Sequence, residues 1–177
     1  MVFLQGTLIM HKGAIGKTRE EIIQQVKDQE TSVRDFFSYM PIGNASSKLN
    51  KWARQGALIY YLSALTENKR AQGDEIVGKK GLSADQEILD RYGFPKGKIY
   101  HRQPGENYID VVSNMNPLPN ILIEDDCESI GGQKEMTYPN LPEKIRRRIR
   151  SYVVKEFTGI DHLPESPLSL IKERGRG

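Results

Sequence analysis

The chain has 177 residues, of which 26 are Lys or Arg, 23 are Asp or Glu and one is Cys, and its formal net charge is +3. This length fits one domain with its own core, and a single cysteine excludes an internal disulfide and a zinc site of several thiolates. The sequence contains no apolar run long enough to cross a bilayer and no tract typical of nucleic-acid binding. We therefore expect a cytoplasmic protein with neither a membrane nor a nucleic acid as its partner.

The first half of the chain alternates between strand and helix patterns. Apolar residues 2–4 predict a first strand. Thr18 stands three residues before a glutamate, a spacing that forms a capping box, and it predicts a helix over 18–29. A second helix is predicted over 46–55, where a glycine follows, and a buried strand is predicted over 57–62.

The second half begins with a polar, glycine-rich stretch at 67–81, which predicts a mobile surface loop. The other predicted elements are helices over 84–92, 107–113 and 141–150, and strands over 98–102, 121–123 and 152–157. Strands that alternate with helices indicate βαβ units. The expected fold class is α/β: a Rossmann-like three-layer sandwich with a mostly parallel sheet, as one domain over 1–163 with a loose tail over 164–177.

A short apolar run that ends in carboxylates is the most informative local pattern. Residues 121–123 predict a buried strand, and Glu124, Asp125 and Asp126 follow at its end. Open α/β sheets bind ligands outside the carboxyl ends of their strands, and oxygen-rich clusters suit Mg²⁺ or Ca²⁺. We predict a Mg²⁺ site with Asp125 as a direct ligand and Asp126 and Glu124 as further ligands; the alternative is an acidic, solvated loop.

Two other predicted strands end in residues that would share this edge. Together the three strand ends resemble the haloacid dehalogenase-like (HAD) superfamily, in which the first strand ends in Asp-x-Asp-Gly-Thr, the second in Ser or Thr, and a later one in paired acids. The corresponding stretches here are Phe-Leu-Gln-Gly-Thr-Leu-Ile at 3–9, Tyr-Tyr-Leu-Ser at 60–63 and Ile-Leu-Ile-Glu-Asp-Asp at 121–126. The resemblance covers about residues 2–157 and implies a magnesium-dependent phosphatase fold.

The resemblance also implies a small helical insertion after the first strand, at about 11–50, where relatives carry a cap over the site. The aromatic residues Phe36, Phe37 and Tyr39 fall in this segment. They fit either such a cap or ordinary core packing.

Two positions depart from the family pattern. Phe3 and Gln5 stand where the family has its nucleophilic and its acid/base aspartate, and neither side chain can form an aspartyl-phosphate or exchange a proton near neutral pH. Two hypotheses follow. One is a magnesium-dependent phosphomonoester hydrolase that uses metal-activated water, and the other is a catalytically silent binding or interaction module.

The resemblance assigns the contacts to a small phosphorylated or anionic ligand to strand-end residues. These are Gln5, Gly6, Thr7, Ser63 and Arg102. Gly6 permits close backbone approach to a phosphate. Lys96 and Lys98 are alternatives to Arg102, because spacing alone does not choose between the three cations.

A histidine could replace the missing acid/base aspartate. His162, preceded by Asp161, follows the last predicted strand, and His11 follows the first. An Asp-His pair can orient an imidazole as a general base, so Asp125, Asp126 and His162 are the candidate catalytic residues. The alternative for each histidine is an ordinary loop residue that is hydrogen-bonded to the backbone.

Overall fold

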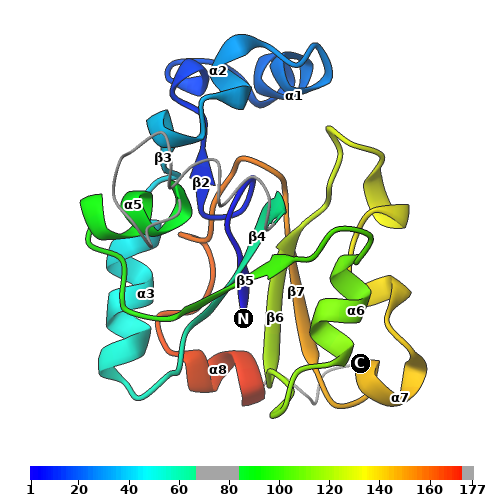
Figure 1. Ribbon diagram of the computed structural model, residues 1–177. Coiled ribbons are helices and arrows are strands. Elements are labelled where there is room, and N and C mark those ends of the chain that lie inside the picture. The colour runs from blue at the N-terminus through cyan, green and yellow to red at the C-terminus, as the bar shows by residue number, and fades with distance from the viewer. Residues whose placement is uncertain (67–83, 173–177) are drawn as a thin grey trace.

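The computed structural model describes residues 1–66 and 84–172 (Figure 1). The predicted loop at 67–81 lies outside these residues. The central sheet has five strands, which are β1 (Val2–Phe3), β4 (Tyr60–Thr66), β5 (Lys98–Arg102), β6 (Ile121–Asp125) and β7 (Arg150–Val154). Their order is β5-β4-β1-β6-β7, and every neighbouring pair is parallel. The predicted α/β fold with a mostly parallel sheet is confirmed.

Helices cover both faces of this sheet, as the two sides of Figure 1 show. The helices are α3 (Ala45–Arg54), α5 (Ala84–Arg91), α6 (Tyr108–Ser113), α7 (Glu143–Arg146) and α8 (Pro167–Lys172). Because successive strand residues point to opposite faces, the strands divide between two buried clusters. One cluster joins alternate strand residues to α3, α5 and α8, and the other joins the intervening residues to α6 and α7.

The strand residues show this division directly. Val2 and Ile123 lie in the cluster that contains Trp52 of α3, whereas Phe3 and Leu122 lie in the cluster that contains residues of α6. The alternation makes a three-layer sandwich in which the central strand β1 is buried on both faces. Central parallel strands are normally covered on both sides in this way.

A small insertion follows β1 and lies above the carboxyl ends of the strands in Figure 1. It is bounded by two short antiparallel strands, β2 (Ile9–Met10) and β3 (Met40–Pro41). Between them lie η1 (Lys12–Ala14), α1 (Arg19–Lys27), α2 (Thr31–Arg34) and η2 (Phe36–Ser38). Thr18 caps α1 with the predicted capping box. The helix α3 that follows packs on the sheet and is therefore not part of the insertion.

Three predicted elements differ most in their bounds from the structure. The predicted helix over 141–150 is only the four-residue α7, because Ile149 is buried and β7 begins at the next residue. The strand predicted over 57–62 begins only at Tyr60 and extends to Thr66, and Leu58 is 81% exposed. Strand β7 ends at Val154 rather than at 157, which places Glu156 beyond the strand.

The segment after Pro164 also differs from the predicted loose tail. It forms α8, and Leu170 is buried against the sheet. The hydroxyl of Tyr152 and the guanidinium of Arg150 both donate hydrogen bonds to the Leu170 carbonyl, at 2.6 and 2.9 Å. Its apolar face and these two bonds hold the helix; residues 173–177 lie outside the described part. None of the described helices has the length and apolar character that crossing a membrane requires.

Candidate metal and ligand site

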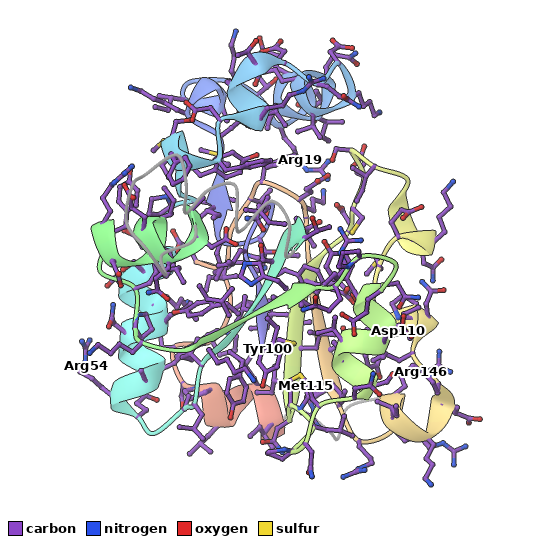
Figure 2. All side chains as sticks on the ribbon, viewed as in Figure 1. Arg19, Arg54, Tyr100, Asp110, Met115 and Arg146 are labelled. Carbon is purple, nitrogen blue, oxygen red and sulfur yellow. The ribbon has the colours of Figure 1, made fainter. Side chains whose placement is uncertain are left out.

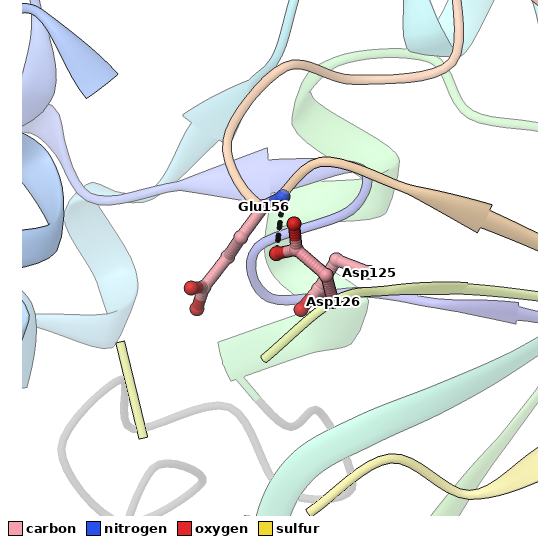
Figure 3. A group of neighbouring side chains, drawn as sticks. All are labelled: Asp125, Asp126 and Glu156. Carbon is pink, nitrogen blue, oxygen red and sulfur yellow. Dashed lines mark hydrogen bonds between the residues drawn. The ribbon is translucent and has the colours of Figure 1, made fainter. Parts of the chain in front are cut away.

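Three carboxylates meet at the carboxyl edge of the sheet (Figure 3). Asp125 is the last residue of β6, Asp126 follows it, and Glu156 lies just after β7. Strands β6 and β7 are paired in parallel with Asp125 opposite Val154, so their ends lie side by side. One oxygen from each carboxylate lies within 4.8 Å of the others, so the group could hold a metal ion.

Asp125 is held by two donors from neighbouring loops. The Thr7 hydroxyl donates to Asp125 Oδ2 at 2.7 Å, and the Cys127 amide donates to Oδ1 at 3.0 Å. Gly6 has φ +83°, and a Cβ at this position would lie 2.8 Å from Asp125 Oδ2. The turn after β1 therefore needs glycine both for its left-handed backbone and for the close approach of the carboxylate.

Glu156 and Asp126 are also held by hydrogen bonds, one of which joins the two residues directly. The amide and hydroxyl of Ser129 donate to the two oxygens of Glu156 at 2.7 and 2.6 Å. The Glu156 amide donates in turn to Asp126 Oδ1 at 3.1 Å, which is the dashed line in Figure 3. An ionised carboxylate has about four lone-pair sites, so all three side chains retain acceptor capacity for a cation.

Arg19 brings a positive charge to the site from the insertion. Located at the start of α1, it pairs with Asp126 at 3.1 Å and Glu128 at 2.6 Å, and its Nε donates to the Glu156 carbonyl at 2.9 Å. Figure 2 shows Arg19 on the side of the insertion that faces the strand ends. The contact ties the insertion to the two acidic loops and partly neutralises Asp126.

The other two carboxylates are not neutralised in this way. Burial raises the pKa of Asp125, although the hydrogen bond from Thr7 opposes the shift. Burial likewise raises the pKa of Glu156, opposed by the bonds from Ser129. Asp125 is 5% and Glu156 6% exposed, so their negative charge has little water to stabilise it. A cation at this position would offset that cost.

A cavity of about 730 Å³ separates the strand ends from the insertion. From the sheet side it is lined by Phe3, Gln5, Gly6, Ala64, Leu65, Tyr108, Asp125, Cys127, Ser129, Ile130, Glu156 and Phe157. From the insertion it is lined by His11, Val26, Gln29, Val33, Arg34, Phe36 and Tyr39. Two of the three carboxylates therefore line a space that can admit a ligand.

Glu124, predicted as a metal ligand, does not belong to the carboxylate group. It is buried and accepts hydrogen bonds from the amides of Thr137 and Tyr138, at 2.7 and 2.9 Å. Adjacent strand residues point to opposite faces, so Glu124 and Asp125 are directed apart. Of the three predicted ligands, Asp125 and Asp126 are brought together. The third carboxylate of the group is Glu156, which was not predicted, instead of Glu124.

Gln5 and Ser63, predicted to contact phosphate, both bind Asp85 instead. Gln5 Nε2 donates to Asp85 Oδ1 at 2.8 Å, and the Ser63 hydroxyl donates to Oδ2 at 2.5 Å. His101 Nε2 lies 2.9 Å from the same Oδ2, and the side-chain oxygen Oε1 of Gln5 accepts from the Ala64 amide. We call Gln5, Ser63, Asp85 and His101 the Asp85 network.

The other predicted ligand contacts also have partners within the protein. Thr7 donates to Asp125, as described. Arg102 donates to the Ala64 carbonyl at 3.2 Å, and its guanidinium lies 4.3 Å from the ring centroid of Tyr108. These positions make Thr7 a support for the carboxylate and place Arg102 beside a residue that lines the cavity.

The two candidate histidines occupy different environments. His162 is exposed, and the carboxylate of its neighbour Asp161 accepts hydrogen bonds from the Asn44 amide at the start of α3. His11 is 1% exposed and lines the cavity. Its Nδ1 lies 3.1 Å from the Ser32 hydroxyl, and its Nε2 is buried with no hydrogen-bond partner among the described residues.

Comparisons of the chain with protein-family models, with curated proteins and with solved structures find no match. The fold and the site therefore define the protein: an α/β protein with a five-stranded parallel sheet and a buried group of two aspartates and a glutamate that could hold a metal ion.

Proposed function

We propose that Asp125, Asp126 and Glu156 bind a divalent cation, Mg²⁺, together with a small phosphorylated ligand in the adjoining cavity. The observation that carries the proposal is the close approach of three carboxylates, two of them buried, at the edge of a parallel sheet. Clusters of hard oxygen ligands suit Mg²⁺. The resemblance of the three strand ends to the HAD superfamily supports the same ion.

The electrostatic balance of the site supports a bound cation. Arg19 partly neutralises Asp126, but burial raises the pKa of both Asp125 and Glu156, so these carboxylates are costly to ionise without a partner. Each of them takes hydrogen bonds from Thr7, Cys127 or Ser129 that fix its orientation. Supporting donors of this kind hold metal-ligating side chains in place in other proteins.

The way in which proteins usually bind Mg²⁺ supports the proposal of a phosphorylated ligand. Proteins usually supply one or two carboxylates, and substrate phosphates and water complete the coordination. The cavity lies directly against Asp125 and Glu156. The resemblance to a phosphatase superfamily points the same way, although the predicted phosphate donors Gln5, Thr7 and Ser63 are engaged within the protein.

The reaction, if the protein has one, is phosphomonoester hydrolysis. When bound, a divalent cation neutralises phosphate charge and activates water. Phe3 and Gln5 cannot supply the carboxylates of an aspartyl-phosphate mechanism.

A catalytically silent binding module is the second candidate, and two contacts favour it. The Phe3 ring packs edge-on against Tyr108 with 5.0 Å between centroids, and the Gln5 side-chain amide both donates and accepts within the protein. Both residues of the first strand end are thus committed to structure. Measured turnover of a generic phosphomonoester separates the two candidates.

Replacing Asp125 by Asn tests the metal proposal. The variant keeps the shape of the side chain and removes one charge, so we expect Mg²⁺ affinity measured by calorimetry to fall at least tenfold, ~1.4 kcal/mol. Asp90→Asn is the matched control, because Asp90 is an exposed residue of α5. Equal Mg²⁺ affinity in both variants would overturn the proposed site.

A further inference from the structure

We propose that the ligand carries a flat, aromatic body that fills the cavity, with His11 as the residue that hydrogen-bonds to a polar group on that body. The inference deepens the proposed function, because it takes the charged end of the ligand to lie at the carboxylates. It names the chemical class of the ligand as a phosphomonoester of an aromatic or heteroaromatic alcohol.

The size of the cavity calls for more than a cation and a phosphate. A metal ion and a phosphate group have about six heavy atoms, which displace roughly 180 Å³ if each takes the ≈ 30 Å³ share of a water molecule. The cavity has about 730 Å³, within the range of sites that enclose a whole small molecule. The remaining space lies between the strand ends and the insertion.

The walls of that space are apolar and aromatic on both sides. The sheet side supplies the rings of Phe3, Tyr108 and Phe157, and the insertion supplies those of Phe36 and Tyr39. Aromatic rings prefer to pack against other flat rings in offset or edge-on arrangements, as Phe3 and Tyr108 already do. A flat ring system is therefore a better match to these walls than a polar chain such as a sugar or a polyol.

The backbone of Phe157 indicates that this part of the cavity wall is maintained at an energetic cost. Its backbone has φ +66°, a left-handed conformation that is an outlier for a bulky residue, and its amide donates to the Gly6 carbonyl at 2.7 Å. The bond holds Phe157 beside the turn that carries Gly6. The cost of the conformation is accepted at a position where the side chain lines the cavity.

His11 supplies the polar contact. An imidazole nitrogen that is buried without a partner costs free energy, and the Nε2 of His11 has none among the described residues. A ligand group would satisfy it once the ring turns so that this nitrogen, which is closed to solvent here, faces the cavity that His11 lines. Burial lowers the pKa of His11, so the ring is neutral near pH 7 and suits a neutral hydrogen-bonding group better than an anion.

The charge of the lining fits a ligand with a single anionic end. Arg34 is the one cationic side chain among the described residues that line the cavity, and it is exposed and donates to Gln29 at 2.8 Å. A second phosphate or a carboxylate on the ligand body would find no other cation on these walls. The body is therefore neutral.

The test compares binding of 1-naphthyl phosphate, glycerol 2-phosphate and 1-naphthol to the full chain, with and without Mg²⁺. We expect 1-naphthyl phosphate to bind at least tenfold more tightly than glycerol 2-phosphate. Val33→Trp fills the cavity from the insertion and should remove that preference while leaving Mg²⁺ affinity unchanged. Val153→Trp is the matched control, because Val153 is 51% exposed on β7 and does not line the cavity.

His11 is tested with probes that carry a ring nitrogen, 6-quinolinyl phosphate as an acceptor and 3-indolyl phosphate as a donor. One of the two should bind at least threefold more tightly than 1-naphthyl phosphate, and His11→Phe should abolish the difference while circular dichroism remains unchanged. Equal binding of all three probes to the wild-type protein would remove His11 from the proposal.

The outcomes separate this inference from the proposed function. Binding of Mg²⁺ and of both phosphates with equal affinity would overturn the aromatic class and leave the proposed function standing. Binding of 1-naphthol that Val33→Trp abolishes, without any response to Mg²⁺ or phosphate, would support the cavity and overturn the proposed function. No binding of any probe would overturn both.

Discussion

Two buried polar groups lie at the same edge of the sheet and differ in how their charge is balanced. In the Asp85 network, the single carboxylate is surrounded by Gln5, Ser63 and His101, each of which bonds to it. In the other group, Asp125, Asp126 and Glu156 place three carboxylates together, and Arg19 compensates chiefly Asp126. The carboxylate group therefore holds more negative charge than the Asp85 network, and two of its three members, Asp125 and Glu156, are buried.

The difference teaches how a structural polar cluster is distinguished from a binding site. A buried polar group whose members satisfy one another stabilises and orients the chain without any ligand. A buried group that holds uncompensated charge destabilises the folded protein until a partner of opposite charge binds. The Asp85 network takes up residues for which a ligand role was predicted, whereas Asp125 and Glu156 of the carboxylate group line the cavity and belong to a group that could hold a metal ion.

Asp85→Ala should produce the largest effect on stability. It tests whether the Asp85 network stabilises the fold. The substitution leaves Gln5, Ser63 and His101 without their shared partner, so we expect the unfolding free energy in urea to fall by ~3 kcal/mol. Mg²⁺ affinity of the folded protein should change little. Asp90→Ala on the same helix is the control, and it should stay within about 0.5 kcal/mol of wild type because Asp90 is exposed.

A large loss of Mg²⁺ affinity in Asp85→Ala, measured where the variant remains folded, would contradict the separation of the two groups. The Asp85 network would then be part of the metal site.

The pH dependence of the unfolding free energy should show a smaller effect. It tests whether the carboxylate group holds uncompensated charge. Because burial raises the pKa of Asp125, its contribution to stability is fully present below the unfolded carboxyl pKa of about 4 and is lost as the pH rises through the folded pKa. An asparagine at this position does not ionise, so its contribution to stability does not fall as the pH rises. Without divalent cations, Asp125→Asn should therefore gain stability relative to wild type as the pH rises above the unfolded carboxyl pKa of about 4.

The measurement is urea denaturation of both proteins at each pH, repeated with Mg²⁺, which should narrow the difference at the higher pH by stabilising the wild type. A difference in unfolding free energy that is independent of pH would mean that the charge of Asp125 is compensated within the protein.

Arg19→Met should have the smallest effect and sharpens the account of the carboxylate group. Arg19 is a resident cation on Asp126, so it repels a metal ion that binds nearby. Its removal should tighten Mg²⁺ binding by about threefold, ~0.7 kcal/mol, a size typical of partly exposed ion pairs. Lys17→Met removes the same charge from an exposed residue beside α1 and should have no effect.

Weaker binding in Arg19→Met would show that Arg19 matters more for positioning Asp126 than for its charge.

The sequence predicted the fold more fully than the site. The strand and helix patterns identified the parallel sheet because hydrophobic periodicity and capping signals such as Thr18–Glu21 are local. They also placed Asp125 and Asp126 at a strand end. Glu124 could have been set aside from sequence alone, because neighbouring strand residues point to opposite faces.

Other site residues were missed for identifiable reasons. Glu156 was placed inside a strand predicted to reach 157, whereas β7 ends at Val154. Arg19 reads as an ordinary surface residue at a helix start, and its partners lie more than 100 residues away. The Asp85 network joins four separate segments, so no local pattern shows it.

Helix α1 of the insertion packs apart from the core of the sheet, whereas Ile9, Phe36 and Tyr39 of the insertion pack in the cluster that contains α3, and this has an evolutionary consequence. Ile22 and Ile23 of α1 are buried but belong to neither of the two clusters that flank the sheet. The insertion contributes His11, Val33 and Phe36 to the cavity wall, whereas the carboxylates come from strand ends. Mutations at Val26 of α1 or Val33 of α2 can thus reshape the cavity while the sheet keeps its core and its acids, whereas mutations at Phe36 or Tyr39 would disturb both.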